Sequence, residues 1–285
     1  MAVSLNLEEF PHTINVKNIW KHHSIHDSQK LNIKKYCDKV VDGKVKVDYY
    51  MKHEFGRLHL KEPTVYSSVA MWNAVRSTLF ADTEYDIDIV GCHQNILLGI
   101  CKGIVECYKL EYYCQNRAEI INSIDINDKA IVKFNKDNMD NKTKKDLVKS
   151  LFTIIMYGGS VSTWETEFAL TIDDYTLTPF VKEFTDEINM LADVVVHLPQ
   201  YKSIKKQVYL KQKSKRIRQI AYENANKQDK RRKDEVFDIY KFTVKSCKTL
   251  SIILQDIERL IITDAIAFLQ TDHNVTVTSY NYDGF

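Results

Sequence analysis

The chain has 285 residues, a formal net charge of +2 and a hydrophobic fraction of 44%. That length allows one large domain or two to three interleaved subdomains, and the composition is typical of a globular protein rather than a disordered or fibrous one. The sequence contains no apolar run of about eighteen residues and no secretory signal at its N-terminus, so we expect an intracellular protein, cytoplasmic or nuclear, with no membrane partner.

Histidines and cysteines give no clear metal or disulfide signature. His22, His23 and His26 lie close together near the N-terminus, but no neighbouring residues complete a ligand set, so a polar surface is the favoured interpretation. The six cysteines contain no C-x-x-C pair, and we interpret them as free thiols.

The first informative stretch is EYDIDIVGCHQNILLGI, residues 84–100. Its alternation predicts a strand over 84–90 that places Asp86 and Asp88 on one face and two isoleucines on the other, facing the core. Apolar residues then repeat at three and four, which predicts a helix over 95–115. The carboxylates can form a catalytic site, but aspartate at the end of a strand can equally cap backbone amides.

A second short strand is predicted over 130–134, and the segment NKTKKDLVKSLFTIIMYGGS follows at 141–160. Asn141 or Thr143 can cap a helix over 142–157, and one of the two glycines can end it in a left-handed conformation. Lys145 and Lys149 then share a face, with Tyr157 near it. Either this is a surface helix with a glycine stop, or it grips a polyphosphate with its lysines and a base with its tyrosine.

Further helices are predicted over 180–197 and 203–227. Between Lys202 and Lys233 there are thirteen lysines or arginines and two acids, a local charge of +11, so the rest of the chain carries −9. Two interpretations stay open for this basic arm: a solvated charged helix, or contact with nucleic-acid phosphates. Its densest part contains Lys213, Lys215, Arg216 and Arg218.

A helix over 244–270 and a strand over 275–282 complete the pattern, and the strand leads to Asp283. Because no returning hairpin strand follows, we expect the sequence to be part of a longer protein or a truncated copy. The fold class predicted is α+β and predominantly helical.

Two carboxylates that end strands, with a helix bearing lysines between them in sequence, suit a metal-dependent nucleotidyl transferase. Such carboxylates hold two Mg²⁺ ions, or Mn²⁺ in their place, roughly 3.5–4 Å apart. The lysines neutralise the triphosphate as negative charge moves onto it.

On these motifs the chain, from about residue 56 onward, resembles the palm and fingers of family A DNA polymerases and, more distantly, single-subunit phage-type RNA polymerases. Gly56-Arg57-Leu58 with Arg76 is similar to the element whose arginine contacts primer–template phosphates. Asp88 resembles the motif A aspartate and Asp283 that of motif C. Lys145, Lys149, Tyr157 and Gly158 resemble motif B, which binds the incoming nucleotide. Gln255, with Glu258, resembles the glutamine-bearing helix near the primer terminus.

The chain departs from the family pattern at four positions. Lys145 replaces an arginine, which loses a bidentate contact. Thr153 replaces a phenylalanine, with Phe152 adjacent. His93 replaces the glutamate that crowds the 2′ position of the nucleotide, so the choice between deoxy- and ribonucleotides stays open. Gly284 replaces the second acid of motif C, and Asp86 is a candidate for the missing carboxylate.

The resemblance implies a right-hand architecture: a palm with a small antiparallel sheet, helical fingers and a C-terminal truncation. We expect an N-terminal region over 1–55, either a reduced thumb or a template-binding segment. The first part of the palm follows over 56–135, the fingers with the basic arm over 136–243, and the second part of the palm over 244–285.

The expected partners are primer–template DNA and nucleoside triphosphates, with a helicase or primase in a larger polypeptide or complex as a further prediction. Nothing before residue 56 resembles a proofreading exonuclease. A compact polymerase without an exonuclease resembles the polymerases of viruses and mobile elements. Two alternatives to a DNA polymerase remain: an RNA-synthesising primase or single-subunit RNA polymerase, and a catalytically inactive, polymerase-like nucleic-acid-binding protein or fragment.

Overall fold

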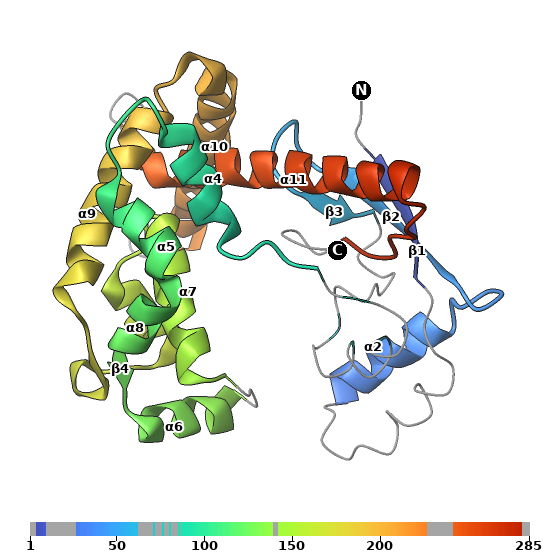
Figure 1. Cartoon of the computed structure of the whole chain (residues 1–285), viewed down its shortest axis with the longest axis horizontal. Coiled ribbons are helices and arrows are strands. Elements are labelled where there is room, and N and C mark those ends of the chain that lie inside the picture. The colour runs from blue at the N-terminus through green and yellow to red at the C-terminus, as the bar shows by residue number, and fades with distance from the viewer. Residues whose placement is uncertain are drawn as a thin grey trace. The chain divides into compact units, whose positions relative to one another are not determined.

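The structure is a computed structural model that describes residues 4–9, 27–61, 71, 76, 80, 85, 87–138, 142–226 and 242–280. It is α+β and mostly helical, as predicted (Figure 1). The chain divides into two compact units. Unit 1 combines Met1–Cys92 with Gln255–Phe285, and unit 2 is His93–Leu254, so the division falls inside the last helix. The assignment of palm and fingers to particular segments stays a prediction.

Unit 1 contains a three-stranded antiparallel sheet in the order β1-β2-β3. The long middle strand alternates buried residues, Val45, Val47 and Tyr49, with exposed Lys46 and Asp48, as a half-buried strand should. The elements of this unit are β1 (Ser4–Glu9), α2 (Asp27–Cys37), β2 (Val45–Met51), β3 (Leu58–Leu60) and the second part of α11 (Ser246–Asp272).

The core of unit 1 joins segments from both ends of the chain. Tyr36 of α2, Val47 of β2 and Ile262 of α11 are buried in one cluster, together with Tyr280 from the C-terminal segment. The Tyr36 hydroxyl donates a hydrogen bond to the buried Glu9 carboxylate at 2.8 Å, which satisfies an otherwise costly polar group. The N-terminal strands and α2 were not predicted, although they supply much of this core.

Unit 2 is a set of helices around an aromatic core in which Tyr113, Phe152 and Phe184 pack ring against ring. Glu187 of α9 accepts hydrogen bonds from the amides of Lys109 and Leu110, and so satisfies the open N-terminus of α5. The elements are α4 (Cys92–Cys101), α5 (Tyr108–Ser123), β4 (Asp125–Ile126), α6 (Asp128–Asn138), α7 (Lys144–Met156), α8 (Val161–Phe168), η2 (Ile172–Asp174), β5 (Tyr175–Thr176), α9 (Pro179–Val195), η3 (Pro199–Tyr201), α10 (Lys202–Asn226) and the start of α11.

Helix α7 begins and ends with the capping residues that its sequence predicts. Thr143 and Asp146 form a reciprocal capping box at its start. At its end, the amides of Gly158 and Gly159 donate to the carbonyls of Ile155 and Ile154, and Gly158 has a φ of +79°, the left-handed stop that was predicted.

Two predicted elements are wrong in the helical region, and one helix was missed. The strand expected over 130–134 lies within α6, because the Asn127 side chain accepts from the Lys129 amide and starts a helix there. The single helix expected over 95–115 is two helices, α4 and α5, which are separated at residues 102–107. Helix α8 was not predicted.

Neither the strand predicted over 84–90 nor the strand predicted over 275–282 forms among the described residues. Of residues 85 and 87–90, only Asp88 makes an isolated bridge, and Ile87 is exposed although its predicted face was the core. Over 275–280 the chain is irregular, because its polar groups find other partners: the Tyr280 amide donates to the Tyr49 hydroxyl at 3.3 Å.

No helix in the part of the chain that the structure describes is long and apolar enough to cross a bilayer.

We predict that Gly158→Ala destabilises the protein more than Gly103→Ala. Both glycines have a φ of +79°, but a Cβ at Gly158 would lie 2.6 Å from Cys247 Cβ, whereas Gly103 has open space around it. Gly103→Ala should cost about 1 kcal/mol from left-handed strain alone, and Gly158→Ala about 2–4 kcal/mol. Urea unfolding of the two variants measures the difference, and equal losses would contradict a close approach at Cys247.

Candidate functional site

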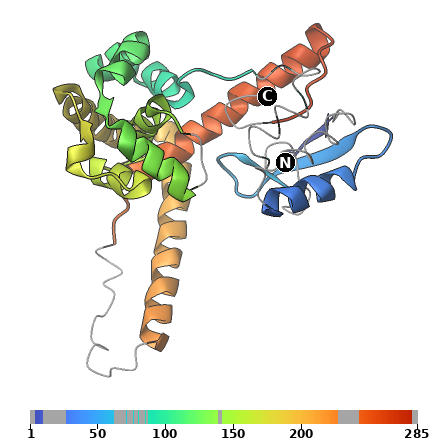
Figure 2. The ribbon, with the colours of Figure 1, turned by 90° about the horizontal axis from the view of Figure 1, so that it is seen from below.

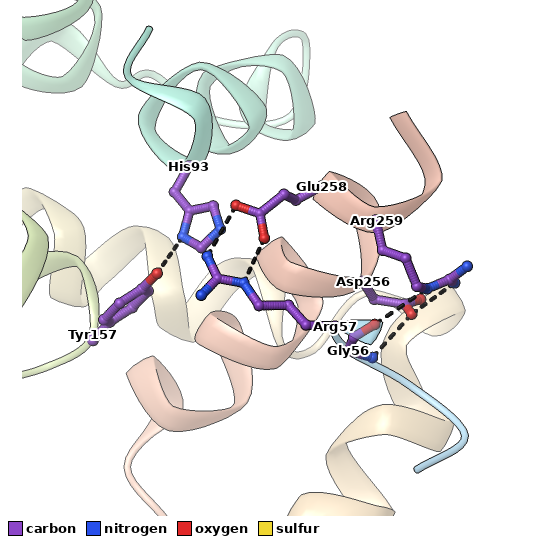
Figure 3. A network of polar contacts seen from close by, with 7 residues as sticks. All are labelled: Gly56, Arg57, His93, Tyr157, Asp256, Glu258 and Arg259. Atoms are coloured by element: carbon purple, nitrogen blue, oxygen red, sulfur yellow. Dashed lines mark hydrogen bonds and ion pairs between the residues drawn. The ribbon is translucent and has the colours of Figure 1, made fainter. Parts of the chain in front are cut away.

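The Gly56-Arg57-Leu58 element contacts α11 through its backbone. The Gly56 amide donates to Asp256 Oδ1 at 3.0 Å, and Arg259 Nε donates to the Gly56 carbonyl at 3.1 Å (Figure 3). Arg259 also pairs with Asp256 at 2.9 Å, so each partner of the glycine is itself held. Gly56 has a φ of +98°, a conformation that favours glycine at this turn.

Arg57 forms a two-pronged ion pair with Glu258. Its Nε and Nη2 donate to the two carboxylate oxygens of Glu258 at 2.6 and 3.0 Å. The Glu258 side chain is 1% exposed and that of Arg57 is 25% exposed. A carboxylate so deeply buried needs such a partner, and a planar guanidinium supplies the best one. Arg57 therefore has a structural role, and its contact with primer–template phosphates stays a prediction.

Tyr280 lies beside this ion pair. Burial raises the pKa of Tyr280, the negative charge of Glu258 raises it further, and Arg57 and Arg259 act in the opposite direction. Its ring also meets that of Tyr49 edge-on, with 5.5 Å between the centroids. The segment that leads to the predicted motif C aspartate is thus anchored next to Arg57 and α11.

Asp88 stands directly before a residue of the same core. Ile89 packs against the hydrophobic cluster of unit 1 that contains Leu58, Ile262 and Tyr280, while Asp88 itself is exposed. Four segments of the polymerase-like pattern, around residues 57, 89, 258 and 280, therefore meet in unit 1. Asp283 and Asp86, the other predicted metal ligands, lie outside the described residues, so their distance from Asp88 stays a prediction.

Gln255 and Arg76 are two further predicted site residues of unit 1. Gln255 is half-buried, and its side-chain oxygen is the nearest group to the position of a Cβ on Gly56, at 3.9 Å. Arg76 is half-buried in helical backbone. Gln255 is thus on the helix that contacts the Gly56 turn, and the contact of Arg76 with primer–template phosphates stays a prediction.

In unit 2 the structure brings His93 and Tyr157 together. The Tyr157 hydroxyl lies 2.6 Å from His93 Nδ1, and the two rings meet edge-on with their centroids 5.5 Å apart (Figure 3). His93 is in the first turn of α4 and Tyr157 caps the end of α7, so residues 64 positions apart form one polar contact. His93 is 7% exposed, and Tyr157 is half-buried.

The predicted lysines lie on the outer side of α7. Lys145 and Thr153 are exposed and Lys149 is half-buried, whereas the opposite side is buried in the core. Phe152 is one of those buried residues, and its ring packs against Tyr113 and Phe184. Phe152 therefore does not take the place of the family's phenylalanine, because its ring belongs to the core.

The predicted basic residues of α10 are accessible. Lys215, Arg216 and Arg218 are exposed, and Lys213 lies half-buried with its ammonium 5.6 Å from the centre of the Tyr209 ring. Gly158, the last predicted residue, fixes the end of α7 against Cys247, as described above.

Within the described residues, no group of three or more His, Cys, Asp or Glu side chains is placed to hold a metal ion. Of the predicted metal ligands, only Asp88 is among the described residues, whereas Asp86 and Asp283 lie outside them. The histidines at 22, 23 and 26 also lie outside the described residues.

The chain matches no protein-family model, no curated protein and no solved structure. Its function is therefore argued from its own residues.

The contacts of Asp256 and Arg259 with Gly56, and of Glu258 with Arg57, were not predicted from the sequence. A signal was present, because QDIER interrupts an otherwise apolar stretch of α11, SIIL before it and LII after it. Polar residues at such a place on a buried helix need partners. Nothing in the sequence, however, indicated which residues, 200 positions away, those partners would be.

We predict that Glu258→Gln lowers the free energy of unfolding by about 2–4 kcal/mol, because it leaves the Arg57 charge without its buried partner. Asp186→Asn is the control, since it removes an equally short ion pair to Lys182 that is largely exposed. That control should change stability little, because solvent screens exposed pairs. Chemical denaturation compares the two, and a similar small change in both would contradict a structural role for Glu258.

Proposed function

We propose that this chain is a template-directed DNA polymerase that transfers nucleotides to a primer 3′-hydroxyl. The observation that carries the proposal is the convergence in unit 1. The segments around Arg57, Ile89, Glu258 and Tyr280 are far apart in sequence, yet they pack on one core. A mixed helical protein without this chemistry gives no reason why these particular segments should meet.

The contact between His93 and Tyr157 supports the same proposal independently. The resemblance assigned both residues to the incoming nucleotide on separate grounds, one from each of two motifs, and they share a 2.6 Å hydrogen bond. Lys149 is two turns before Tyr157 on α7 and half-exposed, so it is available to an anionic ligand. We assign Lys145 and Lys149 to the triphosphate, and Tyr157 with Gly158 to the base and its neighbourhood.

Asp88, Asp283 and Asp86 are the residues that would hold Mg²⁺. Their carboxylate oxygens are the ligands that this ion prefers, and the exposed Asp88 side chain, next to core-bound Ile89, is both accessible and fixed in position. When bound, the metal would activate the attacking hydroxyl and neutralise the leaving group.

One observation favours an RNA-synthesising enzyme as the second candidate. The residue at the position that normally excludes a 2′-hydroxyl is His93, and its ring is held by Tyr157. An imidazole differs from the family's carboxylate in both charge and shape. The enzyme can therefore differ from family A polymerases in how strongly it rejects ribonucleotides. Ribo- and deoxynucleotides offered in the same extension assay separate the two candidates.

The proposal predicts that Asp88→Asn lowers primer extension with Mg²⁺ by at least about a hundredfold, because the substitution removes a charged metal ligand. The assay uses the chain together with any coding sequence that continues beyond Phe285. Asp137→Asn, an exposed acid of α6, is the control and should leave extension unchanged. Equal extension by wild type and Asp88→Asn would exclude this metal site.

A second prediction concerns the nucleotide. Lys149→Gln should raise the KM for the nucleoside triphosphate about tenfold or more, because it removes a charge-assisted contact to phosphate. Lys144→Gln is a control on the same helix, since the Lys144 ammonium pairs with Asp125 at 2.7 Å. Steady-state kinetics at saturating primer–template measures both, and matching KM values for the two variants would remove Lys149 from the binding site.

A further inference from the structure

Helix α10 is anchored at its start and exposed beyond it. Ile204 and Val208 are buried, and the Tyr209 ring packs against Phe242 with 5.7 Å between centroids. From Ser214 to Gln219, every residue is exposed. Figure 2 shows the helix extending away from the other helices of unit 2. A helical segment exposed on every side contributes nothing to the core of its unit.

The positive charge of this segment surrounds the helix instead of covering one face. With about 100° per residue, Lys213, Arg218, Lys215 and Arg216 project at roughly 0°, 140°, 200° and 300°. Between Lys202 and Asn226 there are eight basic residues and one acid, Glu223. Within the exposed stretch itself there is no acid, and Arg218 Nε donates to the Ser214 carbonyl of the same helix.

That distribution selects among anionic partners. A membrane surface or an acidic protein face would meet one side of the helix and leave the cations on the other side unpaired. The major groove of B-form DNA is about 12 Å wide, admits an α-helix and has phosphates along both edges. An α-helix with its side chains is about 10–12 Å in diameter, which matches that width.

Exposed apolar side chains within the cationic segment agree with a groove. Ile217 is 43% exposed and Tyr222 is 72% exposed. On the same scale Ile217 projects at roughly 40° and Tyr222 at roughly 180°, so the two lie on different sides of the helix. With Ile217 on the floor of the major groove, its side chain would face base edges and thymine methyl groups. The narrow, deep major groove of an A-form RNA duplex would not admit the helix.

We propose that the segment of α10 from Lys213 to Tyr222, with its exposed stretch from Ser214 to Gln219, binds in the major groove of double-stranded B-form DNA. This goes beyond nucleotidyl transfer, because it requires neither a primer end nor the carboxylates assigned to catalysis. It holds or fails independently of the polymerase proposal.

The test measures binding of the full chain to a closed, nick-free DNA duplex by fluorescence anisotropy over a series of salt concentrations. The variant replaces Lys213, Lys215, Arg216 and Arg218 by glutamine, which preserves helix propensity. Affinity should fall at least about tenfold, and the slope of log K against log salt should flatten by up to about 3.6, at 0.9 per lost phosphate contact. Circular dichroism confirms that α10 remains helical.

A matched control replaces four exposed lysines elsewhere, Lys39, Lys46, Lys102 and Lys136, by glutamine and so makes the same change in net charge. It should keep most of the affinity. If the two quadruple variants lose affinity equally, binding reflects net charge alone and the proposal is overturned.

The wild-type chain supplies a second measurement that does not depend on any variant. An RNA duplex of the same sequence should bind at least about tenfold more weakly than the DNA duplex. Equal binding of both duplexes, or stronger binding of single strands, would overturn the assignment to the major groove. Asp88→Asn should bind duplex DNA as wild type does, so loss of catalysis and loss of this surface are told apart.

Discussion

The buried carboxylate of Glu258 is the constraint on which the organisation of unit 1 depends. At 1% exposure it cannot remain charged without a partner, and Arg57 is the partner that the structure supplies, through two hydrogen bonds. Because Arg57 follows Gly56 directly, the same contact brings the glycine backbone within reach of Asp256 and Arg259. The Gly56-Arg57 segment and α11, about 200 residues apart in sequence, are thus held in a fixed register by contacts of the Gly56 backbone and of the Arg57 side chain.

The same constraint reaches the C-terminal segment through Tyr280. A phenol that is buried beside a carboxylate stays neutral, which the raised pKa of Tyr280 expresses, and it can therefore lie against the Arg57–Glu258 pair without adding a charge. Its amide and its ring both contact Tyr49, in the middle strand of the sheet. The predicted motif C aspartate is three residues further on. The contacts of Tyr280 therefore hold the described end of this segment against the sheet and the ion pair.

The sequence predicted those parts of the fold whose signals are local. Helix α7 was predicted with its cap and its left-handed glycine, because Thr143, Asp146 and Gly158 each act on neighbouring backbone. The strand expected over 130–134 failed because a run of β-branched and aromatic residues is ambiguous at that length, and the Asn127 cap decided for a helix. The alternation of β2 was present in the sequence but was not recognised.

For the candidate site, the sequence suggested individual residues but not the contacts between them. His93 and Tyr157 were each identified, but their hydrogen bond depends on how α4 packs against α7, for which no local pattern exists. Glu258 was noted, yet its pairing with Arg57 required knowledge of a loop closed over about 200 residues. Non-local contacts of this kind are decided by which buried charges must be satisfied, and a single sequence does not say where the satisfying group will be.

Helices α10 and α11 show how the same length of helix can serve two purposes. The 27 residues of α11 carry buried apolar side chains along their length, and its buried charges Glu258 and Arg259 are paired. In α10 the buried side chains, Ile204 and Val208, lie near the start of the helix. The exposed stretch after them is stabilised by helix propensity and by that anchored start. Because packing places no demand on the exposed positions, the basic side chains there, Lys215, Arg216 and Arg218, are free to be selected for a ligand. A cationic helix without a core-facing side is therefore better explained by what it binds than by what it stabilises.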